Sequence, residues 1–481
     1  MFQKRRYEKV LEIISSKNID FKKRVLFDGE NEVTILYIKQ LTDANKLSEY
    51  IIRPIMQYAS KNKVPFKADV LVQSVIYAED CTVEQNDNNI IDILLNGKAV
   101  LLLANDKHYI TANIKKIERK PISNPELTFT LRGPKDSFTE DLDTNISLIR
   151  YRIKDENLKI DYFEIGERTK AKVGVIYIKD VVNSKHVQEI RKRIKDICVG
   201  GIVESGELQA FLLNNKYSLF PQMGIVERSD MACGALLEGK TVILTEGSGI
   251  GLIAPKTLSE YLWSCEDNYD NKFFGAYSRL LRIFAIFLTL TVTPLYVALV
   301  SFRLDVLPAD YIIAIASSRA TVPFNTFTEA LILEGIVEIL REAMLRVPKQ
   351  IGPAIGIVGA IVIGEAAISA GLFSPLLLII VSLSLLTSFV SPDYTLVNPL
   401  RVLKAFMLVL TGVFGVFGFV IGLNMILTNT ISTNSLGVPV LAPFSPMNVK
   451  DEIKSIFYNK SIVSDRPNFL NLKNNVRKRD S

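Results

Sequence analysis

Histidine, cysteine and tryptophan are scarce in this sequence of 481 residues, which has two histidines, four cysteines and one tryptophan. With His108 and His186 alone, a Ser-His-Asp triad, an HExxH zinc site or a zinc finger is nearly excluded. The cysteines are far apart and form no CxxC pair, which is typical of free thiols in a reducing compartment. We therefore expect no enzyme, no catalytic residue, no metal site and no bound cofactor.

The amino terminus lacks the apolar core of a signal peptide. Residues 1–24 (MFQKRRYEKVLEIISSKNIDFKKR) are rich in charge, so we expect the large N-terminal region to stay in the cytoplasm. Lys and Arg cluster there and again in the tail at 466–479, although the formal net charge is only +6. No aromatic residues are interleaved with them and no nucleic-acid motif occurs. We interpret them as anchors to anionic lipid and expect no nucleic-acid partner.

Long apolar runs are present instead, and they are confined to the second half of the chain. Hydrophobic residues make up 48% of the sequence, yet residues 1–280 have an ordinary soluble composition and the excess lies in 281–430. About 20 apolar residues suffice to cross ~30 Å of hydrocarbon. The predicted membrane helices are 283–302, 351–373, 375–390 and 405–427. Residues 309–318 and the acidic helix after them form a fifth element, which spans the membrane, re-enters it or lies at its surface.

The soluble half contains an internal repeat. Residues 33–55 resemble 173–194, with Tyr-Ile-Lys in both, and residues 94–110 resemble 236–253. Each copy has a β-branched run, a polar turn and an amphipathic helix, and later a strand, a glycine turn and a second strand. We predict an α/β soluble N-terminal region of two duplicated subdomains, followed by an all-α multi-pass membrane domain. The predicted boundaries are 1–120 and 160–270 for the two subdomains, 121–159 for a connecting helical segment, 280–430 for the membrane domain and 431–481 for a basic tail.

One segment matches the pattern of a phosphate-binding P-loop. Residues 234–241 (GALLEGKT) satisfy G-x-x-x-x-G-K-T. A P-loop follows a strand and opens a helix, so that backbone N–H groups hold the phosphate. Here a helical segment precedes the glycine and a β-branched run follows it. We therefore interpret the pattern as a glycine turn between a helix and a strand, and not as a nucleotide site.

The segment 324–348 (FNTFTEALILEGIVEILREAMLRVP) predicts a helix with two different faces. At ~100° per residue, five apolar residues share one face: Ile332, Leu333, Ile336, Ile339 and Leu340. Glu334, Glu338 and Glu342 lie at i, i+4 spacing on the opposite face, with Arg341 at its edge. Like charges at this spacing repel, and more strongly away from water. The stripe therefore needs a partner, water or a cation, which predicts an ion path or a polar contact between subunits.

Two further charged residues lie among the apolar segments. Glu365 is in the middle of the predicted span 351–373, where an ionised carboxylate costs at least ~2.5 kcal/mol. It is either a protonated or hydrogen-bonded contact between helices or a group on an ion route. Arg319 precedes Pro323, and it either pairs with the acidic helix or extends to the lipid headgroups.

The basic residues give conflicting orientations for the membrane domain. If the acidic helix crosses, Arg346, Lys349, Arg401 and Lys404 lie inside, but the basic tail lies outside. If it does not cross, the tail lies inside and those four residues lie outside. We favour an inside tail because it is long and carries more basic residues.

The residues above resemble one family over nearly the whole chain, the A subunit of GerA-type spore germination receptors. Two departures occur: Ser229 replaces the usual proline of a Thr-Glu-Arg-Pro-Asp motif, and Glu365 replaces a neutral polar residue. The segments that carry the resemblance are 138–140 (FTE), 145–152 (NISLIRYR), 220–222 (FPQ), 236–239 (LLEG), 322–324 (VPF), 338–343 (EILREA), 346–348 (RVP), 437–439 (GVP) and 441–444 (LAPF).

The resemblance implies a subunit of a nutrient germinant receptor in the spore inner membrane. It implies a transporter-like B subunit that binds the nutrient, a lipoprotein C subunit, and A subunits that oligomerise into a cation-conducting channel. The ion-path or gating candidates are then Glu329, Glu334, Glu338, Glu342 and Glu365, and their counter-charges are Arg319, Arg341 and Arg346. The alternatives are a membrane-anchored scaffold, a secondary transporter component without its own pore, and a membrane-tethered nucleotide-binding enzyme.

Overall fold

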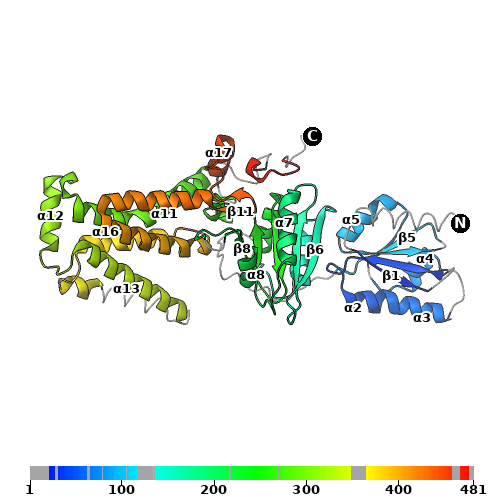
Figure 1. The fold of residues 1–481 in the computed structure, drawn as a ribbon. Coiled ribbons are helices and arrows are strands. Elements are labelled where there is room, and N and C mark those ends of the chain that lie inside the picture. The colour runs from blue at the N-terminus through cyan, green and yellow to red at the C-terminus, as the bar shows by residue number, and fades with distance from the viewer. Residues whose placement is uncertain are drawn as a thin grey trace.

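A computed structural model describes residues 21–27, 31–61, 66–78, 80–104, 106–115, 134, 136–215, 218–268, 271–347, 364–457 and 466–475. Two sheet domains and a helical region follow one another along the molecule (Figure 1). The α/β character of the N-terminal region and the helical character of the C-terminal region agree with the sequence-based prediction.

The first sheet domain has five antiparallel strands in the order β1-β2-β4-β5-β3. Its core lies on both faces of the sheet, because Ile35 packs with the cluster around Ile51 and Leu101, while the next residue, Leu36, packs on the other face with Leu94. The strands are β1 (Lys22–Leu26), β2 (Val33–Tyr37), β3 (Cys81–Glu84), β4 (Ala99–Leu103) and β5 (Tyr109–Ala112). The helices are α2 (Ala44–Lys46), a π-helical turn (Leu47–Ile52), α3 (Arg53–Lys61), α4 (Ala68–Ser74) and α5 (Ile90–Leu95).

The second sheet domain repeats this topology, since its order is β6-β7-β9-β10-β8. The equivalent positions are occupied by the segments that resemble each other in sequence, which is what a duplicated unit would produce. The duplication itself stays a prediction. The strands are β6 (Leu158–Ile165), β7 (Ala171–Ile178), β8 (Gly224–Val226), β9 (Thr241–Thr245) and β10 (Gly251–Ala254). The helices are α6 (Leu142–Arg152), α7 (Ser184–Lys195), α8 (Ser205–Leu212), α9 (Ser229–Leu237) and α10 (Leu258–Tyr261).

The P-loop-like segment is a turn that leads from helix α9 into strand β9, as the sequence analysis predicted. Gly239 has a φ of +87°, and Gly97, between α5 and β4, has the same left-handed conformation with a φ of +80°. Lys240 is buried and forms ion pairs with Glu260 and, at 3.4 Å, with Glu238. Burial lowers the pKa of Lys240, but the two carboxylates outweigh this effect and raise it. The lysine therefore serves the core of the domain and not a phosphate.

Replacing Lys240 tests this structural role. We expect Lys240→Ala to destabilise the chain by roughly 3–5 kcal/mol, because Glu238 and Glu260 lose a buried partner. Thermal unfolding of the purified full chain in detergent would measure the loss. The control is Lys185→Ala on the exposed side of α7, which we expect to change little. Equal unfolding temperatures for both variants would contradict the role.

At Ser229, where the family usually has a proline, the serine side chain makes contacts that hold the turn before α9. The Ser229 hydroxyl donates to Asp136 and accepts from Arg152 Nε at 2.9 Å, while Arg152 Nη2 is 2.7 Å from the same aspartate. Burial raises the pKa of Asp136, but the hydrogen bonds from Arg152 and Ser229 outweigh burial and lower it. A proline at this position could not make these hydrogen bonds. The side-chain hydrogen bonds of the serine therefore take the place of the rigidity that a proline would give to the turn.

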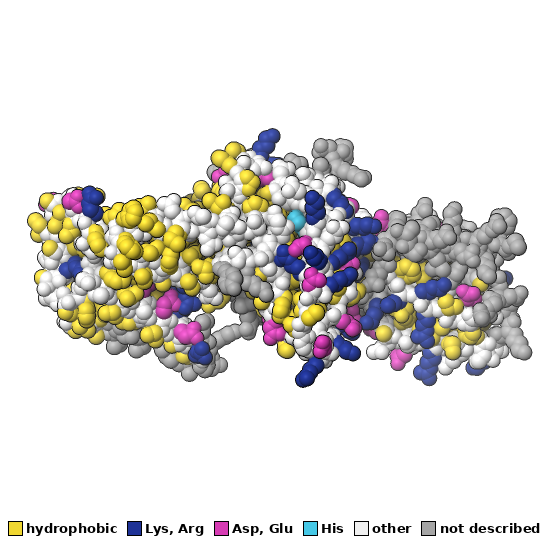
Figure 2. All heavy atoms as spheres, viewed as in Figure 1, with side chains coloured by type: hydrophobic (Ala, Val, Ile, Leu, Met, Phe, Trp, Pro, Cys, Tyr) yellow, Lys and Arg dark blue, Asp and Glu magenta, His cyan; other side chains and the backbone are white. Residues whose placement is uncertain are grey.

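The helical region contains α11 (Lys272–Phe302), α12 (Ala309–Arg319), α13 (Thr326–Arg346), α15 (Pro375–Ser388) and α16 (Tyr394–Ser432). The predicted span 283–302 lies within α11, and 375–390 corresponds to α15. Residues 351–363 of the predicted span 351–373 lie outside the described residues. Among those described, α11 from Phe273 and α16 are long and apolar enough to cross a membrane, and Figure 2 shows the broad apolar surface of this region.

Helix α16 corrects the prediction of one span over 405–427. Gly415 has φ 63° and ψ −142°, a conformation open only to glycine, and the chain reverses there. A Cβ on Gly422 would lie 2.6 Å from Met407 Sδ, although about 15 residues of straight helix would separate them by about 22 Å. The two arms, 394–414 and 416–432, therefore lie side by side (Figure 1). Hydropathy gave no sign of this turn, because both arms are equally apolar.

Both ends of α16 contact the second sheet domain. Asp393, which caps the first arm, is 2.5 Å from Lys256 Nζ, and the Thr433 hydroxyl after the second arm is 2.9 Å from that of Ser218. The tail then continues over the sheet domain through β11 (Asn434–Ser435), β12 (Val438–Pro439) and α17 (Val449–Phe457), and the backbone N–H of Lys473 donates to the Val181 carbonyl at 3.1 Å. The described part of the tail thus lies on the same side of the helical region as the sheet domains.

Candidate functional site

Helix α13 carries most of the predicted site residues, and it is capped by Asn325, whose side chain accepts a hydrogen bond from the backbone N–H of Thr328. Leu333 is buried in the helical core, but Ile339 is 70% exposed and Ile332 is also exposed. The predicted apolar face is therefore split, and part of it points outward. This arrangement suits a membrane helix, whose outer side meets lipid while its charges turn towards other helices.

Two carboxylates of α13 contact the first arm of α16. Glu334 Oε1 is 2.7 Å from Lys404 Nζ, and both side chains are largely buried. Glu338 Oε2 accepts a hydrogen bond from Arg401 Nε at 2.8 Å. Glu338 is also 3.7 Å from Arg341 Nη1, the counter-charge that the i, i+3 spacing suggested. These contacts join two helices that are more than sixty residues apart in sequence.

Arg341 extends the same group of contacts to a third helix. Its side chain is 8% exposed, its Nη2 donates to Ser388 Oγ of α15 at 3.3 Å, and its guanidinium lies 5.3 Å from the centre of the Phe389 ring. Five residues therefore form one charged cluster between α13, α15 and α16, which we call the α13–α16 charge cluster: Glu334, Glu338, Arg341, Arg401 and Lys404.

Glu329 forms a separate buried ion pair near the start of α13. Its side chain is fully buried, with Oε2 3.2 Å from Arg319 Nη1 and Oε1 accepting a hydrogen bond of 2.5 Å from the backbone N–H of Ser374. Ser374 caps α15, so the carboxylate also lies at the positive end of that helix. Arg319 Nη2 donates to the Phe324 carbonyl at 3.3 Å, which ties the turn between α12 and α13 to this pair.

The remaining two candidates lie apart from these contacts. Glu342 pairs with Arg346 at 2.7 Å within the last turns of α13, where both side chains are more than half exposed. Glu365 is exposed on the helical residues 364–369, and within the described part of the chain no ion pair to it occurs. The structure therefore pairs Glu334 and Glu338 with basic residues of α16, pairs Glu342 with Arg346 of its own helix, and leaves Glu365 outside these ion pairs.

Sequence reasoning identified the carboxylates but missed the partners of two of them. From the sequence, Arg401 and Lys404 informed only the orientation in the membrane, because they are far from α13 in sequence and no sequence pattern links them to it. Their spacing of i, i+3 in an otherwise apolar arm was the available signal. Charged residues within an apolar helix face other helices or water, which indicates that both needed partners.

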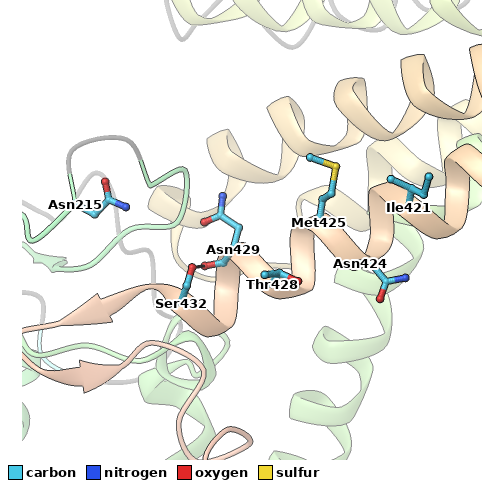
Figure 3. A pocket seen from close by; sticks show the side chains of 7 residues that line it. All are labelled: Asn215, Ile421, Asn424, Met425, Thr428, Asn429 and Ser432. Atoms are coloured by element: carbon cyan, nitrogen blue, oxygen red, sulfur yellow. Dashed lines mark hydrogen bonds between the residues drawn. The ribbon is translucent and has the colours of Figure 1, made fainter.

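A surface hollow occurs where the second arm of α16 meets the loop after α8 (Figure 3). None of the predicted site residues lines it. Polar side chains spaced four apart, Asn424, Thr428 and Ser432, follow one edge of the arm. The full lining is Asn215, Ile421, Asn424, Met425, Thr428, Asn429 and Ser432.

Comparison with known proteins places this geometry in context. The model of the Bacillus/Clostridium GerA spore germination protein family matches residues 8–469. Spore germination protein A1 of Bacillus subtilis is 34% identical over 437 residues, which cover 90% of this chain and 89% of that protein. Spore germination protein GerQA of Bacillus cereus is 32% identical, with 96% and 92% covered.

One solved structure is also similar to this chain. It is the crystal structure of the N-terminal domain of the A subunit of the Bacillus megaterium spore germinant receptor GerK3, at 27% sequence identity. The match covers 51% of this chain and 92% of that one, with a TM-score of 0.38.

Proposed function

The chain belongs to the GerA family of spore germination proteins, and on this premise we propose that it is a germinant receptor subunit that converts nutrient binding into ion release across the spore inner membrane. The relatives named as spore germination proteins support the role in germination. The charge cluster supports the conversion step, because several helices contact one another there through buried and partly buried charges. The nutrient binds a partner subunit in this proposal, and the present chain responds.

The proposed assembly contains several copies of this chain together with a transporter-like B subunit and a lipoprotein C subunit. The copies surround a path for monovalent cations. No nucleic acid, metal or cofactor takes part. The alternative is a scaffold or transporter component without its own pore, and the paired state of Glu334 and Glu338 is compatible with that alternative as well.

The proposed orientation places both sheet domains and the tail in the cytoplasm. The reversal at Gly415 supports it, because a helical hairpin returns the chain to the side from which it started. Helix α13 then crosses the membrane and brings Arg346 to the same side as Arg401, Lys404 and the tail. The conflict between these basic residues disappears, since it arose from treating α16 as one crossing.

The proposed mechanism uses the charge cluster as a lock. In the closed state, Lys404 and Arg401 hold the carboxylates of Glu334 and Glu338 between α13 and α16. A germinant bound to a partner stabilises a state in which α13 moves away from α16, and the receptor shifts toward that state. The freed carboxylates then meet water and attract cations. Glu329 joins the start of α13 to Arg319 of α12 and to the cap of α15, so these elements move together with α13.

Glu338→Gln tests the role of this carboxylate in the cation path with little disturbance of shape. We expect germinant-triggered K⁺ release to weaken while the level of the protein stays normal, because the opened path loses a carboxylate that attracts cations. The matched control is Glu342→Gln, which removes the same charge four residues away, where the partner Arg346 is exposed on the same helix. Normal release from Glu338→Gln spores would remove the residue from the path and leave it a structural contact.

A further inference from the structure

Helix α17 (Val449–Phe457) has its polar and apolar sides reversed relative to a helix on a soluble protein. Asp451 is 4% exposed and Ser455 is 9% exposed, so the polar side faces the rest of the molecule. Met447, just before the helix, is 74% exposed, Val449 52% and Ile453 46%. A helix surrounded by water would turn these apolar side chains inward.

Specific contacts hold α17 in this orientation. The Asp451 carboxylate accepts hydrogen bonds from the backbone N–H of Asn468 at 2.8 Å and from its side-chain amide at 3.1 Å. Arg279 of α11 donates through Nη1 to the carbonyl of Ser455 at 3.1 Å and to that of Ile456 at 3.2 Å. The buried polar side is thus satisfied from two directions. These contacts fix the orientation of α17 and thereby keep its apolar side exposed.

The neighbourhood of α17 has the composition of a membrane surface. The helix packs on the beginning of α11, where Phe273, Phe274 and Tyr277 are all more than half exposed. Aromatic residues gather in this way at the boundary between hydrocarbon and water. In Figure 2 an apolar patch lies over α17, at the junction between the helical region and the second sheet domain. Lys450 is exposed beside the apolar residues of the helix.

We propose that α17 lies in the headgroup layer of the membrane, with Met447, Val449 and Ile453 inserted toward the acyl chains. Lys450 then meets the anionic headgroups. The partner is the lipid surface, because the apolar residues belong to a helix that packs on the aromatic beginning of α11 and a basic residue flanks them. The inference rests on the proposed membrane crossing of α11. The insertion of α17 would attach the tail and the second sheet domain to the membrane surface at a second point, in addition to α11.

The depth of a spin label at position 453 tests this proposal. The full chain, with its four native cysteines replaced by serine, carries Ile453→Cys and is reconstituted into vesicles of phosphatidylcholine and phosphatidylglycerol. The label's accessibility to oxygen, which enters hydrocarbon, is compared with its accessibility to a nickel chelate, which stays in water. Reference labels are Phe284→Cys on the exposed apolar side of α11 and Glu207→Cys on the exposed surface of α8.

We expect the oxygen-to-nickel ratio at 453 to lie several-fold above that at 207 and below that at 284, as a position at the membrane surface requires. A ratio at 453 equal to that at 207 would place the helix in water and overturn the proposal. Low accessibility to both reagents at 453 would also overturn it, because another protein surface would then cover the helix. A water-like ratio at 284 would instead refute the membrane crossing of α11, so the two failures are distinguishable.

Discussion

Removing the positive charge of Lys404 is expected to lower the amount of receptor in the spore membrane several-fold. In Lys404→Met the carboxylate of Glu334 remains in a largely buried site without its partner at 2.7 Å. Removal of one member of a buried ion pair costs about 3–5 kcal/mol, which is a large part of the stability of most proteins. The amount of the subunit in purified spore membranes, measured with an antibody, gives the result.

The double variant Glu334→Gln with Lys404→Met separates stability from gating. Replacing both members of a buried pair by uncharged residues is often close to neutral, so we expect the amount of receptor to recover. Without the lock, however, the germinant concentration that triggers release should be lower than in the wild type, even though the loss of the Glu334 carboxylate slows the release itself. A double variant with normal amount and an unchanged germinant response would contradict the lock and favour a scaffold.

The second large effect is expected at the turn of the helical hairpin. Gly415→Val should prevent the two arms of α16 from packing, because valine is strongly disfavoured at φ 63° and its Cβ would lie 2.8 Å from the ring of Phe302. Strain of this kind costs roughly 1–3 kcal/mol before the clash is included. We expect loss of the protein, or a carboxyl terminus on the wrong side of the membrane.

Labelling of a cysteine added at the carboxyl terminus, in a chain whose four native cysteines are replaced by serine, measures that side in intact protoplasts and after lysis. The wild-type terminus should react with an impermeant reagent only after lysis. The control is Gly335→Ala in α13, where an added Cβ meets open space and the glycine is not in the left-handed region. A wild-type terminus that reacts in intact protoplasts would contradict the hairpin as the basis of the proposed orientation.

The sequence predicted those features that depend on local patterns. Alternation and β-branched runs located the strands, and the order of helix, Gly239 and strand was sufficient to reject the P-loop. The i, i+4 spacing placed Glu334, Glu338 and Glu342 along one side of α13. The pairing of Glu338 with Arg341 and of Glu342 with Arg346 follows from the same helical geometry.

Contacts between distant segments were beyond these patterns. The partners of Glu334 and Glu338 come from α16, and hydropathy places that segment in the membrane without indicating which helix it faces. The reversal depends on the left-handed conformation of Gly415. Glycines also occur at 412, 418 and 422, so the sequence did not indicate at which of them the chain turns. The return of the tail to the second sheet domain could not be predicted either, because it depends on the packing of α16 and on the reversal at Gly415.

A disulfide between α13 and α16 tests the lock most directly. Phe327 and Gly412 are in close contact, since a Cβ built on Gly412 would meet the Phe327 ring, so Phe327→Cys and Gly412→Cys in a chain without native cysteines should join the helices. We predict that oxidised receptors do not release K⁺ on addition of germinant and that a reductant restores the response. Normal release from receptors shown to be fully oxidised would contradict the account.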